Sequence, residues 1–95
     1  MEKKEFFVDL LEITDKSSLH NRLREKLSLP SWYGNNLDAL YDVLTDMEVP
    51  ACIHFLGWEK AVRRFPSYMK AFRKVLSDAE KDNPGLSIVF EDLKE

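Results

Sequence analysis

Three short apolar segments lie among longer stretches with helical periodicity. The apolar segments span residues 5–12 (EFFVDLLE), 51–56 (ACIHFL) and 86–90 (LSIVF), and each is rich in aromatic and aliphatic residues. Short, nearly continuous apolar runs of this kind are typical of strands that are mostly buried. The pattern therefore predicts three strands in a sheet that is covered by helices.

Apolar residues recur every three or four positions in four further segments. These span residues 17–27, 36–45, 57–65 and 66–81. In the first of them Leu19, Leu23 and Leu27 form one apolar stripe, and Ser17 or Ser18 is available as the N-cap. The fourth has one apolar side made of Tyr68, Met69, Phe72, Val75, Leu76 and Ala79. Each connection between strands thus contains two predicted helices.

The order β-α-α-β-α-α-β determines the expected architecture. Strands that are joined by helical crossovers are normally parallel. A chain of 95 residues can bury one modest core, and it contains no internal repeat and no linker. We therefore expect an α/β fold in which a small three-stranded parallel sheet packs against about four helices, as a single domain over residues 1–95.

The stretch LPSWYGNNLDALYDVLTD, residues 29–46, combines an aromatic turn with an acidic helix. At 100° per residue, one helix face carries Leu37, Leu40, Tyr41 and Leu44, and the other carries Asp38, Asp42, Thr45 and Asp46. The first face would hold the helix on the sheet. Asp38 and Asp42 repel each other at i,i+4 by about 0.2 to 0.5 kcal/mol, a cost that would reverse if a cationic surface docked there.

Two interpretations of the turn before this helix are open. Trp32 and Tyr33 lie beside Gly34, which permits a tight turn, and Asn36 can cap the helix. Large aromatic rings next to carboxylates are an interface composition. Alternatively, Asn36 is only a cap, the aspartates form a solvated face, and the aromatics fill the core. Composition alone favours this second interpretation.

Charge and cysteine content narrow the class of protein. Lys and Arg number 14 against 17 Asp and Glu, a formal net charge of −3, so a cationic partner is a better match than nucleic acid. The single cysteine, Cys52, lies in an apolar segment and fits a reducing compartment. No signal peptide and no apolar stretch of about 20 residues is present, so we expect a cytoplasmic protein without a membrane span.

Other candidate chemistry is weaker. Asp38 and Asp42 could form an acid and base pair, but an exposed convex helix offers no substrate cleft, so we expect no enzyme activity. His20 lies in a polar helix, and Cys52 with His54 would need further partners to bind a metal or act as a nucleophile. We expect no catalytic residue, metal or cofactor. The basic residues of segment 60–65 are interpreted as a solvated helix face.

The segment LPSWYGNNLDALYDVLT, residues 29–45, resembles the central segment of the barstar family, whose type member is the cytoplasmic inhibitor of the secreted ribonuclease barnase. A leucine-proline, an aromatic-Tyr-Gly, an Asn-Leu-Asp-Ala-Leu run and a further Asp recur in that family at this spacing. The order of strands and helices also agrees over residues 6–90. The resemblance implies a barstar-like fold and a protein that blocks a ribonuclease active site without chemistry of its own.

The resemblance also implies a partner-binding surface. It comprises Trp32, Tyr33, Gly34, Asn36, Leu37, Asp38, Tyr41, Asp42, Thr45, Asp46 and Glu80. By position, Asp38 and Asp42 match the interface aspartates of the family, and Asp42 is the residue that takes the place of substrate phosphate. In the last helix either Lys74 or Glu80 takes the position of a family glutamate, and we favour Glu80.

This sequence departs from the family pattern at the edges of the motif. Asp46 and Met47 stand where barstar presents a glycine and a tryptophan, in a segment that is one residue shorter, and Tyr41 replaces a tryptophan. Such changes can redirect a binding surface to another enzyme. We expect an inhibitor of a basic ribonuclease or related nuclease toxin, monomeric when free. The alternative is a regulatory binding module that uses the same acidic helix on a basic partner that is not a nuclease.

Overall fold

The sheet consists of three parallel strands. A computed structural model describes residues 2–92, in which the strands are β1 (Lys4–Asp9), β2 (Ala51–Leu56) and β3 (Leu86–Glu91), in the order β1-β2-β3. All three predicted strands and their parallel pairing are confirmed, although β1 ends at Asp9 instead of continuing to residue 12. The chain leaves the sheet after Asp9 because its carboxylate accepts a hydrogen bond from Leu11 N, 2.8 Å away.

The strand register gives the sheet two different faces. Phe6, Ile53 and Ile88 are paired across the sheet, and so are Phe7, His54 and Val89 one position further. Successive side chains of a strand point to opposite faces. Ile53 is fully buried whereas Phe7 and Val89 are exposed, so one face meets the helices and the other faces solvent.

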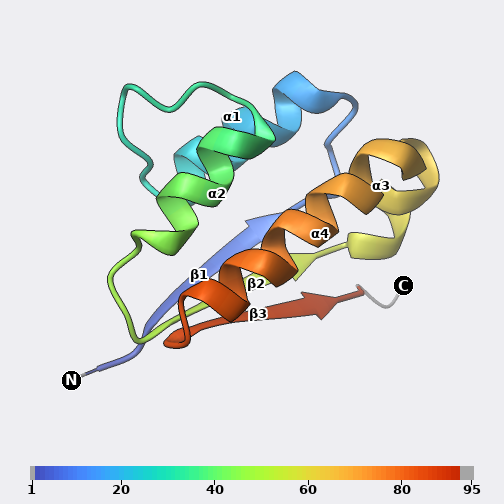
Figure 1. The fold of residues 1–95 in the computed structure, drawn as a ribbon. Coiled ribbons are helices and arrows are strands. Elements are labelled where there is room, and N and C mark those ends of the chain that lie inside the picture. The colour runs from blue at the N-terminus through green and yellow to red at the C-terminus, as the bar shows by residue number, and fades with distance from the viewer. Residues whose placement is uncertain (1, 93–95) are drawn as a thin grey trace.

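The helices cover one face of the sheet. They are α1 (Lys16–Lys26), α2 (Leu37–Thr45), α3 (Trp58–Arg64) and α4 (Pro66–Asp82). Figure 1 shows α1 and α4 on the same side of the sheet, with α1 over β1 and α4 over β3, and α3 at the end where the strands point. The four predicted helices are confirmed.

The start of α1 differs from the prediction. Asp15 is the N-cap, and its carboxylate accepts a hydrogen bond from Ser18 N at 2.8 Å while the Ser18 hydroxyl accepts one from Asp15 N. This reciprocal pair is a capping box. Ser17 or Ser18 was predicted as the cap, but both lie inside the helix, and Ser18, at the third helical position, is the return partner of Asp15.

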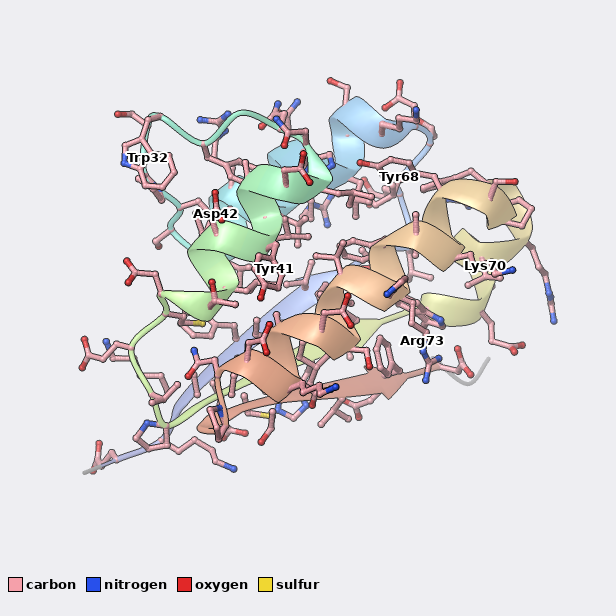
Figure 2. All side chains as sticks on the ribbon, viewed as in Figure 1. Trp32, Tyr41, Asp42, Tyr68, Lys70 and Arg73 are labelled. Carbon is pink, nitrogen blue, oxygen red and sulfur yellow. The ribbon has the colours of Figure 1, made fainter. Side chains whose placement is uncertain are left out.

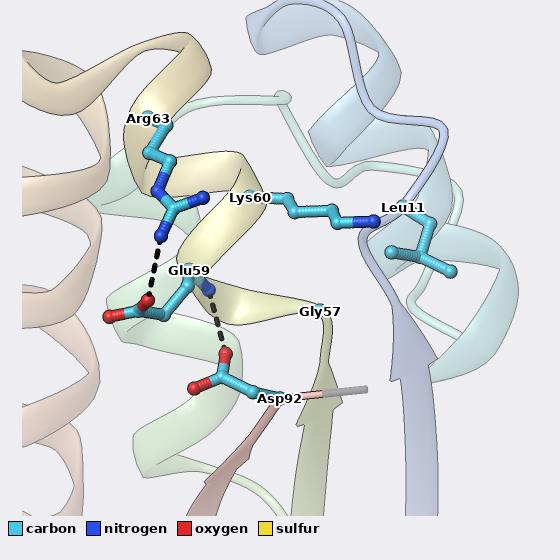
Figure 3. A pocket seen from close by; sticks show the side chains of 6 residues that line it. All are labelled: Leu11, Gly57, Glu59, Lys60, Arg63 and Asp92. Atoms are coloured by element: carbon cyan, nitrogen blue, oxygen red, sulfur yellow. Dashed lines mark hydrogen bonds and ion pairs between the residues drawn. The ribbon is translucent and has the colours of Figure 1, made fainter. Parts of the chain in front are cut away.

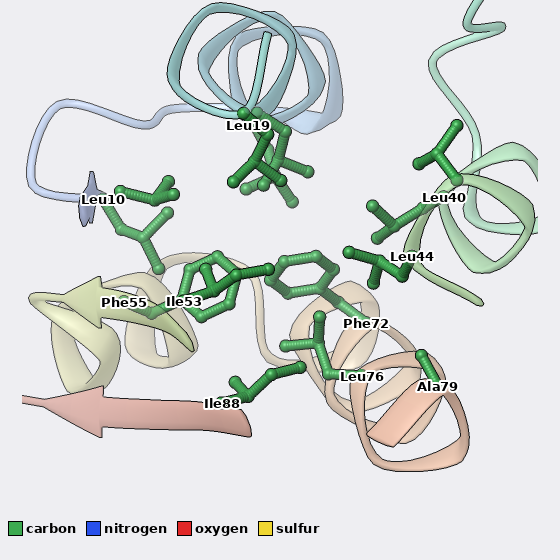
Figure 4. Close-up of a cluster of buried hydrophobic side chains, with 14 of the residues drawn as sticks. Leu10, Leu19, Leu40, Leu44, Ile53, Phe55, Phe72, Leu76, Ala79 and Ile88 are labelled. Atoms are coloured by element: carbon green, nitrogen blue, oxygen red, sulfur yellow. The ribbon is translucent and has the colours of Figure 1, made fainter. Parts of the chain in front are cut away.

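The hydrophobic core lies between the sheet and three helices. Figure 4 shows side chains from β2 and β3, and Leu10 just after β1, meeting Leu19 of α1, Leu40 and Leu44 of α2 and Phe72 of α4. The backbone of α2 lies closest to α4, and its Leu40 and Leu44 reach the core that the sheet also lines. α1 and α4 occupy the sheet face and leave α2 as an outer layer, in which Val43 is also buried.

Within the described part of the chain, no helix has the length and apolar character that crossing a membrane requires.

Candidate protein-binding surface

The loop between α1 and α2 is fixed to α1 by an arginine. Arg24 Nη2 donates to the Tyr33 carbonyl at 2.8 Å and to Asn35 Oδ1 at 2.7 Å. Asn35 has φ of 54°, in the left-handed region that asparagine tolerates better than most residues. Its amide also donates to Asn21 Oδ1 of α1. The loop is therefore attached at several points before α2 begins.

A buried hydrogen-bond network anchors the same loop from inside. His20 is fully buried, its Nδ1 lies 2.5 Å from the Tyr33 hydroxyl and its Nε2 lies 2.6 Å from the Tyr68 hydroxyl. Burial lowers the pKa of His20 and raises the pKa of both tyrosines, so all three groups are neutral near pH 7. The network joins α1, the loop and α4.

This network corrects two predictions from the sequence. Tyr33 was placed on the binding surface, but only 2% of it is exposed, because its ring fills the core and its hydroxyl has an internal partner. His20 was placed in a polar helix, whereas it is part of the core. The sequence does contain a signal for the burial of His20, since His20 precedes Leu23 and Leu27 at the i, i+3, i+7 spacing of one helix face.

Trp32 is the most exposed large apolar side chain of the described residues, at 68%. It projects from the anchored loop beside α2, as Figure 2 shows. Gly34 is exposed next to it, and a Cβ at Gly34 would lie 3.0 Å from Asn36 Nδ2. Asn36 is the N-cap of α2, with its side chain accepting from Ala39 N at 2.8 Å, as predicted.

The outward face of α2 is acidic. The side chains of Asp38, Asp42 and Asp46 are exposed, and within residues 2–92 they form no hydrogen bond or ion pair. Leu37 is half-buried, and the Thr45 hydroxyl donates to the carbonyls of Tyr41 and Asp42 within the helix. Three unpaired carboxylates thus follow one line along the surface of α2.

Tyr41 links this line to α4. Its hydroxyl donates a hydrogen bond to Asp82, and that bond, together with the nearby charges of Asp82, Asp78 and Asp42, raises the pKa of Tyr41. The acidic surface therefore extends from α2 to Asp78 and Asp82 of α4. In Figure 2 Tyr41 points from α2 toward α4, and Asp42 points outward. Asp78 and Asp82 were not predicted, although Asp78 follows half-buried Val75, and Asp82 follows buried Ala79, by three positions, about one helical turn.

Glu80 lies elsewhere. Its carboxylate accepts a hydrogen bond from Ile88 N of β3 at 2.8 Å, so it serves the edge of the sheet and faces away from α2. Lys74, the alternative for the same position, pairs with Asp78 at 3.2 Å. The structure therefore brings Asp78 and Asp82, and not Glu80, to the side of α2.

A recess with polar groups in its lining lies at the carboxyl ends of the strands. It has a volume of about 160 Å³ and is lined by Leu11, Gly57, Glu59, Lys60, Arg63 and Asp92. Figure 3 shows that Asp92 accepts from Glu59 N and that Arg63 pairs with Glu59. Ligand sites usually exceed about 300 Å³, so this recess is too small for one.

Comparison with known proteins relates this chain to a family and to a named protein. The sequence model of the family described as Barstar (barnase inhibitor) matches residues 3–94. A protein of Bacillus subtilis (strain 168) named "Putative ribonuclease inhibitor YrdF" is 29% identical over 80 residues, which cover 83% of this chain and 88% of that protein. Both matches extend over most of the chain, and the family match includes the anchored loop, α2 and α4.

Proposed function

Because this chain belongs to the barstar family, we propose that it is a cytoplasmic inhibitor of a barnase-like ribonuclease or related nuclease toxin. It would occupy the active site of that enzyme as a stoichiometric partner and perform no reaction itself. Members of the barstar family are inhibitors and not enzymes, and the relative in Bacillus subtilis carries a ribonuclease inhibitor's name.

The observation that carries the proposal is the line of exposed carboxylates on α2. Asp38, Asp42 and Asp46 have no hydrogen-bond or ion-pair partner among the described residues, and only Asp38, in the first turn of α2, favours the helix through its dipole. Their mutual repulsion costs a few tenths of a kcal/mol for each i,i+4 pair in the free protein. A cationic active site would convert this repulsion into attraction.

The chemistry of the acidic surface suits a phosphate-binding pocket. A carboxylate accepts two parallel hydrogen bonds from a guanidinium, which is the geometry that arginine also uses for phosphate. We place Asp42 at the centre of the contact, since it lies between Asp38 and Asp46 and beside Tyr41. Asp78 and Asp82 would extend the negative surface over α4.

The anchored loop contributes apolar contact area. Aromatic residues are enriched among those that dominate the binding energy of an interface, and Trp32 is the exposed one that this surface offers. Arg24 and the network around His20 hold the loop before binding, which lowers the conformational entropy lost on association. An interface of standard size, on the order of 1,600 Å² in total, would reach from Trp32 to α4.

The test is an inhibition titration. Increasing amounts of the protein are added to purified barnase, and residual cleavage of RNA is measured. The proposal predicts that activity falls to zero near equimolar ratio. In parallel, the immobilised protein is used to capture a nuclease from its host. Barnase that stays fully active, together with capture of no nuclease, would overturn the proposal, and capture of a basic protein that is not a nuclease would favour the regulatory module instead.

A further inference from the structure

Four polar side chains gather on the solvent-facing side of the sheet, away from α2. Glu5 of β1 pairs in register with Cys52 of β2, His54 follows two residues after Cys52, and Glu91 ends β3. Because strand residues two apart share a face, all four side chains emerge on the same side. From the sequence, Cys52 and His54 lacked a further partner, and parallel pairing with β1 now supplies Glu5.

The donor atoms of three of these residues lie close together. Glu5 Oε1 is 3.0 Å from His54 Nε2, Cys52 Sγ is 3.5 Å from the same nitrogen, and the three ligand atoms all lie within 4.8 Å of one another. In a tetrahedral zinc site with ordinary bond lengths, a sulfur and a nitrogen ligand are about 3.6 Å apart, and a nitrogen and an oxygen about 3.4 Å. The observed spacing is within a few tenths of an ångström for both measured pairs.

The other ring nitrogen of His54 is already positioned as a metal-bound histidine requires. Nδ1 lies 3.0 Å from Glu91 Oε2, so a neutral ring can donate its Nδ1 proton to Glu91 and present the Nε2 lone pair to a metal. A carboxylate in this role orients the ring and increases its basicity. The ring also stacks on Phe7, with centroids 4.5 Å apart and planes at 11°.

The geometry points to a site for a divalent transition metal, of which Zn²⁺ fits best, held by Glu5 Oε1, Cys52 Sγ and His54 Nε2. A thiolate, an imidazole and a carboxylate form a mixed donor set that suits zinc and not magnesium or calcium. Three protein ligands leave a fourth position for water. Glu5 is exposed and the side chain of His54 is 17% exposed, so an ion can enter directly from solvent.

The site is independent of the proposed inhibitor surface. The acidic line is on α2, which packs on α4, whereas the Glu5–Cys52–His54 cluster is on the far side of the sheet. A zinc ion bound there would join β1 to β2 through the ligands and β3 through Glu91. It would stabilise the sheet, because the ion binds only the folded arrangement.

The test uses Co²⁺ as a spectroscopic substitute for Zn²⁺. The reduced full-length protein is titrated with Co²⁺, and absorption is followed in the near-ultraviolet, where thiolate-to-cobalt charge transfer appears, and in the visible region of tetrahedral cobalt. We expect one equivalent to produce both bands, Zn²⁺ to displace it, and thermal unfolding to shift upward with Zn²⁺.

Variants distinguish a specific metal site from adventitious metal binding. Cys52→Ser should abolish the charge-transfer band, and Glu5→Gln and His54→Gln should each lower Zn²⁺ affinity strongly. Glu91→Gln should weaken it by about 10- to 100-fold, since all three ligands remain. Glu25→Gln, an exposed carboxylate on α1, is the control and should change nothing. Circular dichroism confirms that each variant is folded.

Two results would overturn the metal site. One is a wild-type titration with no thiolate band and no Zn²⁺ competition, which would leave His54 as a plain ion-pair partner of the two glutamates. The other is Zn²⁺ affinity that is the same in wild type, Cys52→Ser and His54→Gln.

Discussion

At the scale of single residues, His20 illustrates how a polar side chain can stabilise a core. Its ring is fully buried and lies within hydrogen-bond distance of two tyrosine hydroxyls, one in the loop and one in α4. Neutral imidazole has one donor and one acceptor, which two hydroxyls can satisfy. Protonation would place a charge in this apolar environment, and for that reason the pKa of His20 is lowered by burial.

The lowered pKa predicts a pH-dependent stability. The unfolded chain takes up a proton at His20 near pH 6.5, whereas the folded protein does so only at lower pH. The contribution is therefore complete above about pH 6.5 and is lost as the pH falls toward the folded pKa. Chemical denaturation with a chelator present, at pH 7.5 and pH 5.5, should show a larger loss of unfolding free energy in wild type than in His20→Gln. Equal losses would contradict the account.

For Trp32, unlike His20, we predict little effect on stability, because its exposure means that the fold does not depend on it. Trp32→Ala should change the unfolding free energy by no more than about 0.5 kcal/mol, as is usual for surface positions. Binding to the ribonuclease should weaken by tenfold or more, because an exposed aromatic anchor is lost. Denaturation and surface plasmon resonance on the same preparation measure both. A variant that binds as wild type would remove Trp32 from the interface.

At the scale of elements, α2 depends on its N-cap. Asn36 accepts from Ala39 N, and replacement of such a cap by alanine costs about 1 kcal/mol. We predict this loss for Asn36→Ala in denaturant unfolding, and almost none for Asn36→Asp, which keeps the acceptor oxygen. If Asn36→Asp loses as much as Asn36→Ala, the cap is not the source of the effect.

The elements themselves were predictable, because each carries its own periodicity. The apolar runs gave three strands, and the two faces of α2 separated Leu40 and Leu44 from Asp38 and Asp42 as the structure does. The sequence could not predict which side chains of different elements are in contact. The hydrogen bonds of His20 to two tyrosines, the bond from Ile88 N to Glu80, and the contact of Glu5 with His54 all join residues that are far apart in the sequence or lie in different elements.

The candidate binding surface was predicted in part for the same reason. Asp38, Asp42 and Trp32 are exposed, as the motif implies. They could be predicted because all three lie within one continuous segment of the sequence. Asp78 and Asp82 join the surface only through the packing of α2 on α4. A residue of α4 cannot be assigned to that surface from the alignment of a short motif alone.

At the scale of the whole molecule, charge is distributed unevenly. The net charge is only −3, yet the carboxylates of α2 and the end of α4 form one negative surface. Such a surface accelerates the encounter with a basic enzyme, and this acceleration becomes smaller when salt screens the charges. We predict that the association rate constant falls when ionic strength rises from about 10 mM to 150 mM, where the Debye length shortens from about 30 Å to 8 Å. Stopped-flow mixing measures it, and a salt-independent rate would contradict the electrostatic role.

The most direct test of the inhibitor account is the affinity of the Asp42→Ala variant for the ribonuclease. We predict a loss of at least about 30-fold, equivalent to a hot spot of 2 kcal/mol, with the unfolding free energy within about 0.5 kcal/mol of wild type. Glu25→Ala removes an exposed carboxylate from α1 and should bind as wild type. Equal affinity of Asp42→Ala and Glu25→Ala, or a loss of stability that matches the loss of binding, would contradict the claim that the acidic face of α2 fills the active site.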